Sequence, residues 1–126
     1  MSAYRSAAIV AALSAVLMFA VLAASAKIRA AAGADVGLER GVHRIAASTV
    51  ALLVTGLAWL SWRHPALRRM ALGAFALMLA LSAVGAAGGP SPPAGIAFFN
   101  QAGGLALTAV LAWIWARAQW PAWLKN

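Results

Sequence analysis

Four long runs of apolar residues make up most of the chain, at residues 6–26, 42–62, 66–87 and 96–116. Each run has about 20 residues, the length that an α-helix needs to cross the hydrocarbon core of a bilayer. Between the runs lie a charged connection at 27–41, a tight turn at Pro65 and a loop rich in Gly and Pro at 86–95. Because a backbone in lipid must satisfy its own polar groups, this pattern predicts an all-α, four-helix transmembrane bundle.

The composition supports a membrane protein. Of the 126 residues, 64% are hydrophobic and only 10% are charged, whereas about a quarter of a typical soluble domain is charged. Such a chain lacks the polar residues to cover a surface that faces water. It also has no cysteine, which excludes disulfides, zinc–thiolate sites and iron–sulfur clusters. We therefore expect a single transmembrane domain over residues 1–126.

The basic residues predict how the bundle is oriented. With four spans, both termini and the second connection lie on one side of the membrane, which carries six basic residues and no acid: Arg5, Arg63, Arg68, Arg69, Arg117 and Lys125. On the other side, four basic residues are offset by Asp35 and Glu39. The positive-inside rule then places both termini in the cytoplasm of a cell with a bacterial-type inner membrane. The net charge of +8 lies at helix ends, so it favours anionic-lipid contacts over nucleic-acid binding.

The first run also resembles a secretory signal, because Arg5 precedes it and Ala24-Ser25-Ala26 matches a cleavage site. However, its apolar stretch is longer than the core of a signal peptide, so we expect it to be retained as the first span. Small residues in this run form two neighbouring stripes: Ala8, Ala12 and Ala15, and Ala7, Ala11 and Ser14. Such stripes allow membrane helices to approach closely, although alanine is abundant throughout the chain.

Few polar side chains are placed where they could carry chemistry within the membrane. His43 and Arg44 open the second span, and Asn100 and Gln101 lie near the start of the fourth. Both spans enter from the same side, so these side chains lie at similar depth and are expected to converge inside the bundle. An imidazole here is a candidate heme ligand. The alternative is that His43 hydrogen-bonds a loop carbonyl at the membrane interface.

The remaining polar residues suggest ordinary roles. We expect His64 to be solvated in the turn between the second and third spans. Glu39 shares a face with His43 if the helix begins early, but local pairing of Asp35 and Glu39 with basic residues is favoured. The basic candidates are Lys27, Arg29 and Arg40. No Ser or Thr has a base beside it, so no catalytic residue is assigned and whether the chain is an enzyme stays open.

Three stretches of the chain resemble one four-helix half of heme A synthase, a membrane enzyme of cytochrome oxidase maturation built from two such halves. LAASAKIRAAAGADV is similar to the end of a first helix and its loop, and GVHRIAASTVALLV to the His-Arg motif that opens the second helix. LMLALSAVGAAGGPSPPAGIAFFNQAGGLALTAVLAWIWAR is similar to the third and fourth helices. Together the stretches cover most of residues 20–117.

The resemblance implies a b-type heme site with one histidine on the second helix and one on the fourth. His43 matches the first ligand position, whereas Asn100 stands at the second and Gln101 matches the residue after it. Because an amide is a poor iron ligand beside imidazole, His43 is the one metal ligand implied. Arg44 or Arg29 would neutralise a propionate. The chain departs from the family at position 40, which is Arg instead of an acid, and in lacking the outer-loop cysteines of many members.

Two functions remain open at this point. The first is a heme A synthase-like protein that binds heme through His43 and acts in respiratory oxidase assembly or as an accessory subunit. The second is a structural transmembrane subunit whose heme site has degenerated. A small transporter is less favoured, because no acidic residue lies in the middle of a span. Expected partners are the lipid bilayer and either other membrane subunits or a second copy of the chain.

Overall fold

The computed structural model describes residues 2–31, 35–89 and 91–120, which form four α-helices. These are α1 (Ala3–Ala30), α2 (Gly37–Ser61), α3 (Pro65–Gly88) and α4 (Ala94–Ala118). Each helix is long and apolar enough to cross a membrane. The predicted all-α class with four spans is confirmed, and the chain is a multi-pass membrane protein by helix length and composition.

All four helices begin before their predicted spans, and all except α2 end beyond them, because local signals set the helix ends. Ser2 caps α1 by accepting a hydrogen bond from the backbone N–H of Arg5 at 3.2 Å. Asp35 accepts from the backbone N–H of Gly37 at 2.9 Å, where α2 begins. Pro65 occupies the start of α3, which tolerates its missing N–H. The predicted connection at 27–41 is therefore too long, since α1 continues to Ala30 and α2 begins at Gly37.

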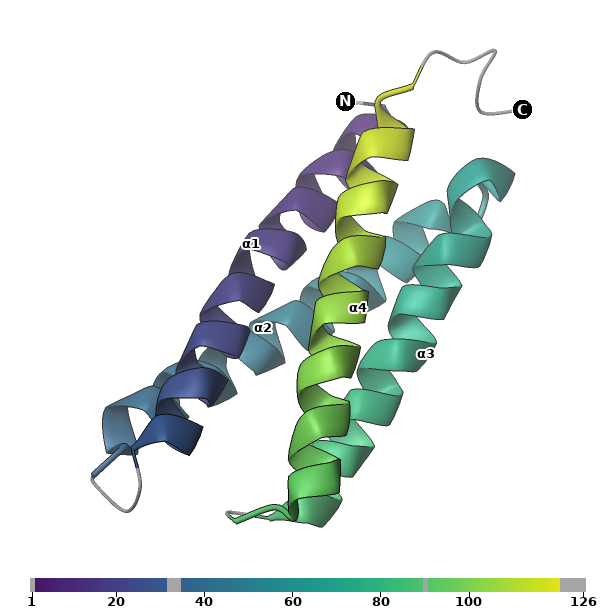
Figure 1. Cartoon of the computed structure of the whole chain (residues 1–126). Helices are drawn as coiled ribbons and strands as arrows, with labels where there is room; N and C mark the ends of the chain where they lie inside the picture. The colour runs from purple at the N-terminus through teal and green to yellow at the C-terminus, as the bar shows by residue number, and fades with distance from the viewer. Residues whose placement is uncertain (1, 32–34, 90, 121–126) are drawn as a thin grey trace.

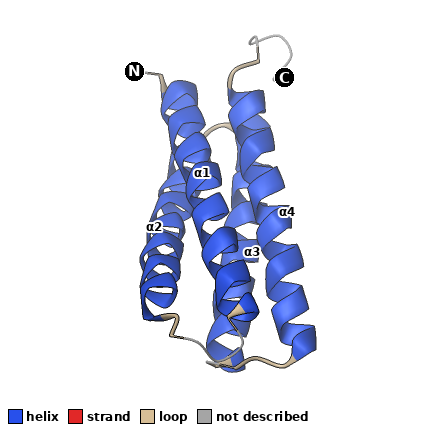
Figure 2. Ribbon diagram, turned by 60° about the vertical axis from the view of Figure 1, so that its left-hand side comes forward, coloured by secondary structure: helices blue, strands red, loops and turns tan. Residues whose placement is uncertain are grey.

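The helices alternate in direction, and the start of α1 lies at the same end of the bundle as the end of α4 (Figures 1 and 2). Helix α1 packs mainly against α2 and α4, while α3 packs against α4 and α2. Helices α2 and α4 therefore occupy diagonal positions. We call the end that holds the start of α1 the terminal end, and the opposite end the distal end.

One stripe from each helix forms the core. On α1 it includes Ala7, Ala11, Ser14 and Met18, spaced by three or four residues as one face of a helix requires. Of the two small-residue stripes in the first span, Ala7, Ala11 and Ser14 are thus the fully buried one. The other helices contribute Val50, Val54, Leu57, Leu67, Ala71, Ala74, Met78, Leu107, Leu111, Ile114 and Ala118.

Burial is uneven along the bundle. On α3 no side chain after Met78 is buried, and on α4 none before Gly104 is buried. The described parts of α1 beyond residue 24 and of α2 before residue 46 likewise contain no buried residue. The core thus occupies the terminal end and the middle of the bundle, and no residue of the four helices is buried at the distal end.

Two adjacent glycines bring α4 close to both of its neighbours. A Cβ atom at Gly104 would lie 2.9 Å from Leu22 Cδ2 on α1. A Cβ atom at Gly103 would collide with the side chain of Leu81 on α3. Small residues are what permit such close packing of membrane helices, so these glycines set how deeply α4 sits between α1 and α3.

Five hydroxyl groups within the helices are satisfied locally, whereas the buried Ser61 Oγ has no partner among the described residues. Each of five side chains donates a hydrogen bond of 2.7–2.8 Å to the carbonyl four residues earlier in its own helix: Ser14, Thr49, Thr55, Ser82 and Thr108. This pairing removes the cost of placing a free hydroxyl in an apolar environment. These side chains therefore need no partner on another helix.

Both termini are expected in the cytoplasm because of the six basic residues on that side. A phosphatase that is active only outside the cytoplasm should be inactive when fused after Asn126. The same enzyme should be active when inserted at Ser91, in the loop that joins α3 to α4 at the distal end. The reverse pattern of activity would contradict the assignment.

Candidate functional site

The polar residues singled out in the sequence all lie at the distal end. His43 and Arg44 are in the second turn of α2, and Arg29 is in the last turn of α1. Asn100 and Gln101 are in the second turn of α4. His43 and the two amide side chains are half-buried, while both arginines are exposed. The shared depth predicted for these residues agrees with the helix bounds.

The two amides on α4 contain unpaired polar atoms. Asn100 Oδ1 and Gln101 Oε1 are shielded from solvent, and neither accepts a hydrogen bond within the described part of the chain. Asn100 faces α3, since a Cβ atom at Gly85 would lie 3.9 Å from its Nδ2 atom. An unpaired polar group away from water is costly, more so within a membrane. These atoms are therefore suited to a hydrogen bond from a bound molecule.

A groove of about 330 Å³ separates the end of α1 from the start of α4. Arg29 and Gln101 are its polar residues, and its apolar walls are Ala94, Ala97 and Phe98. The Arg29 guanidinium makes one long hydrogen bond, 3.3 Å from Nη1 to Ser25 Oγ. The volume is at the lower end of the range for small-molecule sites. The groove could hold an anionic group beside an apolar one.

His43 does not line this groove, and it makes no hydrogen bond to any residue that the structure describes. Its helix, α2, lies diagonally across the bundle from α4. The structure thus brings Arg29 and Gln101 together, and it leaves His43 and Arg44 outside their groove. The alternative hydrogen bond from His43 to a loop carbonyl is not formed within residues 2–31, 35–89 and 91–120.

The acidic residues are placed differently from expectation. Because α2 begins at Gly37, Glu39 lies inside the helix, four residues before His43 and on the same face. Asp35 instead accepts a hydrogen bond from the backbone N–H of Gly37, the first residue of α2. Neither acid forms an ion pair with a described residue, so the predicted pairing with Lys27, Arg29 or Arg40 is wrong. The nearest base in sequence, Arg40, directly follows Glu39 and points from a different side of the helix.

Contacts at the terminal end were not evident in the sequence. His64 was expected to be solvated, but it is half-buried, with its ring 4.7 Å from the ring of Tyr4. Arg117 Nε donates to the carbonyl of Ala66 at 3.0 Å, which joins the end of α4 to the start of α3. Its guanidinium also lies 5.2 Å from the ring of Trp120. The placement of the aromatic and basic residues at helix ends was the only signal of these contacts.

Metal binding by a cluster of side chains is not supported. No group of three or more His, Asp or Glu side chains able to hold a metal ion occurs in the described ranges. A heme iron needs only one or two axial ligands from the protein, so a lone imidazole remains sufficient for that chemistry. No protein-family model, curated protein or solved structure matches this chain.

Proposed function

We propose that this membrane protein binds a b-type heme at its distal end and acts in cytochrome oxidase assembly or as an accessory subunit of a respiratory complex. The observation that carries the proposal is the groove at the distal end, in which the Arg29 guanidinium and the Gln101 amide lie beside apolar walls. The resemblance to half of heme A synthase supplies the identity of the ligand.

The residues fit a heme in their chemistry. The imidazole of His43 makes no hydrogen bond to the described residues, so a ring nitrogen is available to iron. The guanidinium of Arg29 suits a propionate carboxylate, and Gln101 in the same groove has amide N–H donors for the same group. Arg44, next to His43, is a further cation for a propionate. When bound, the heme would supply an iron centre with its redox chemistry.

The fit in space is partial. His43 and the groove of Arg29 and Gln101 do not share one cavity. The proposal therefore depends on ligand chemistry for His43 and on geometry for the groove. With Asn100 at the second ligand position of the resemblance, His43 is the one nitrogen ligand that this site offers.

The absorption spectrum of the purified protein tests the proposal directly. Protein produced in cells with ample heme and purified in mild detergent should show a Soret band, with about one heme per chain by pyridine hemochrome assay. A protein that shows no Soret band, and gains none when hemin is added, would contradict heme binding.

A second candidate function is that of a structural subunit, and it is favoured by the exposed face of α3. A stripe of small residues runs along this face: Gly73, Ala76, Ala80 and Ala83, all exposed. A Cβ atom at Gly73 would meet nothing within 4 Å. Small residues that face lipid make a surface on which another membrane helix can pack closely. Heme-free protein that co-purifies with other membrane subunits would favour this function.

A further inference from the structure

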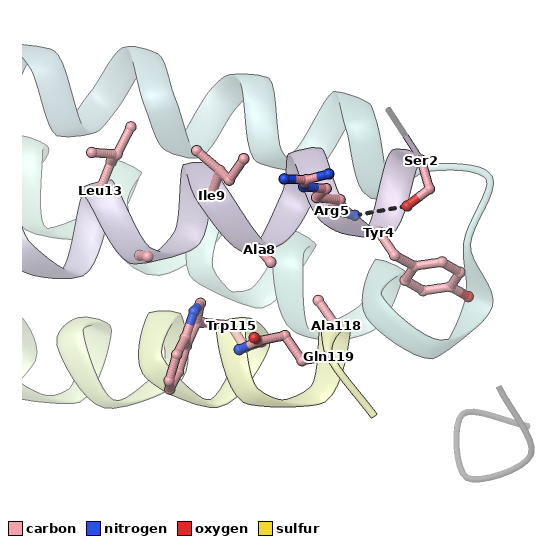
Figure 3. Close-up of a pocket in the computed structure, with 10 residues that line it drawn as sticks. Ser2, Tyr4, Arg5, Ala8, Ile9, Leu13, Trp115, Ala118 and Gln119 are labelled. Atoms are coloured by element: carbon pink, nitrogen blue, oxygen red, sulfur yellow. Dashed lines mark hydrogen bonds between the residues drawn. The ribbon is translucent and has the colours of Figure 1, made fainter. Parts of the chain in front are cut away.

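A second groove lies at the terminal end, far from the candidate heme site. It runs between α1 and α4 and has a volume of about 690 Å³. In Figure 3, Arg5, Ile9 and Leu13 follow one another along α1, and Trp115 and Gln119 lie opposite on α4. Ala8, Ala12 and Ala118 are small residues of its lining. The heme proposal makes no use of this groove.

The lining changes from polar to apolar along the groove. Ser2, Arg5 and Gln119 lie toward the helix ends, whereas Ile9, Leu13 and Trp115 lie toward the middle of the bundle. Eight residues separate Arg5 from Leu13, which corresponds to about 12 Å along a helix. The hydrocarbon part of one leaflet is about 15 Å thick. The groove thus follows the same polar-to-apolar direction as a phospholipid in that leaflet.

Arg5 provides the charge at the polar end. Its side chain is exposed, and its guanidinium makes no ion pair or hydrogen bond with a described residue. Gln119, across the groove, donates a 3.3 Å hydrogen bond from Nε2 to the carbonyl of Trp115, and its amide carries a second N–H. A guanidinium on one wall of the groove and an amide N–H on the other can each bind a phosphate group.

We propose that this groove is a binding site for one anionic glycerophospholipid of the leaflet that surrounds the terminal end. The phosphate lies against Arg5, and an acyl chain lies along Ile9, Leu13 and Trp115. The site differs from general attraction between basic residues and anionic lipids, because the chain lies between the walls of two helices. It goes beyond the proposed heme function and is independent of it.

A lipid titration followed by native mass spectrometry tests the charge requirement. Purified protein in detergent is titrated with dioleoyl phosphatidylglycerol or with dioleoyl phosphatidylcholine, which has the same chains and no net charge. Wild-type protein should bind the first more tightly, and Arg5→Gln should weaken this binding about five-fold, the effect of one basic residue at a membrane surface. The matched control is Arg68→Gln, which removes an exposed base of the terminal end that does not line the groove.

Three outcomes of this titration would overturn the proposal. They are equal affinity of the wild type for the two lipids, an unchanged affinity in Arg5→Gln, and an equal loss in Arg5→Gln and Arg68→Gln. The last outcome would show diffuse attraction to the whole basic end instead of a site.

The apolar part of the groove is tested by filling it. Ala12 is a half-buried residue of the lining, so Ala12→Leu should weaken phosphatidylglycerol binding severalfold. Ala109→Leu makes the same change at an exposed position of α4 outside the groove and should leave binding unchanged. Helical content by circular dichroism verifies that both variants fold. Unchanged binding in folded Ala12→Leu would show that no acyl chain occupies the groove. If this variant does not fold, the comparison of Arg5→Gln with Arg68→Gln tests the lipid site.

Discussion

Replacing Gly104 with Leu is expected to lower the free energy of unfolding by about 3 kcal/mol, the upper end of the usual cost of overpacking. Gly104 is buried on α4, and even a Cβ atom there would lie 2.9 Å from Leu22 Cδ2 and 3.6 Å from Met18 Cε. A Leu side chain would force α1 away from α4 and disturb the core that the two helices share. Unfolding in detergent, followed by circular dichroism and tryptophan fluorescence, measures the loss.

The control for this substitution is Gly56→Leu on α2. A Cβ atom at Gly56 would meet nothing within 4 Å, so the larger side chain has room. Leu is also a better helix former than Gly, and the variant should be as stable as the wild type or slightly more stable. Equal destabilisation by the two substitutions would show that the close approach of α1 and α4 does not hold the bundle together.

The His43→Ala variant is expected to lose the Soret band while it inserts into the membrane as well as the wild type does. If His43 is the axial ligand, its removal leaves the iron with no nitrogen ligand from this site. His43 makes no hydrogen bond with the described residues, so Ala should not unfold the helix that carries it. Free imidazole added to the variant should restore part of the absorbance, because it can replace the missing ligand.

The matched control is His64→Ala, which removes the other histidine of the chain. His64 precedes α3 at the terminal end, where its ring packs against Tyr4. This variant should keep the full Soret band and show at most a modest loss of stability. Equal loss of heme from both variants, or from neither, would exclude His43 as the specific ligand.

The four helices were predictable because the bilayer requires long apolar runs, and the chain has four of them. Their ends were less predictable, since they depend on single side chains. Helix α2 begins at Gly37, whose backbone N–H donates to Asp35, so a segment that was predicted to be a charged connection is partly helical. Gly88, predicted to lie in the loop before the fourth span, instead belongs to α3, which Gly89 follows with a positive φ of 67°.

For the candidate site, the sequence predicted how deep each residue lies in the membrane, but it did not predict which side chains lie together. Helix bounds alone place His43 and Asn100 near the distal end. Which side chains meet depends on the order of the helices around the bundle, and this order puts Arg29 of α1 beside Gln101 of α4. The groove at the terminal end could not be predicted, because Arg5 and Trp115 are brought together by helix packing and are far apart in the sequence.

The local pairing of hydroxyl groups affects how the spans insert into the membrane and assemble. Ser14, Thr49, Thr55, Ser82 and Thr108 each bond a carbonyl of their own helix, so each span enters lipid with these groups already satisfied. Insertion and assembly are then separate steps, because no span needs another span to pair these hydroxyl groups when it enters the membrane. For the same reason, helices that separate after assembly lose packing contacts without leaving these hydroxyl groups unpaired in lipid.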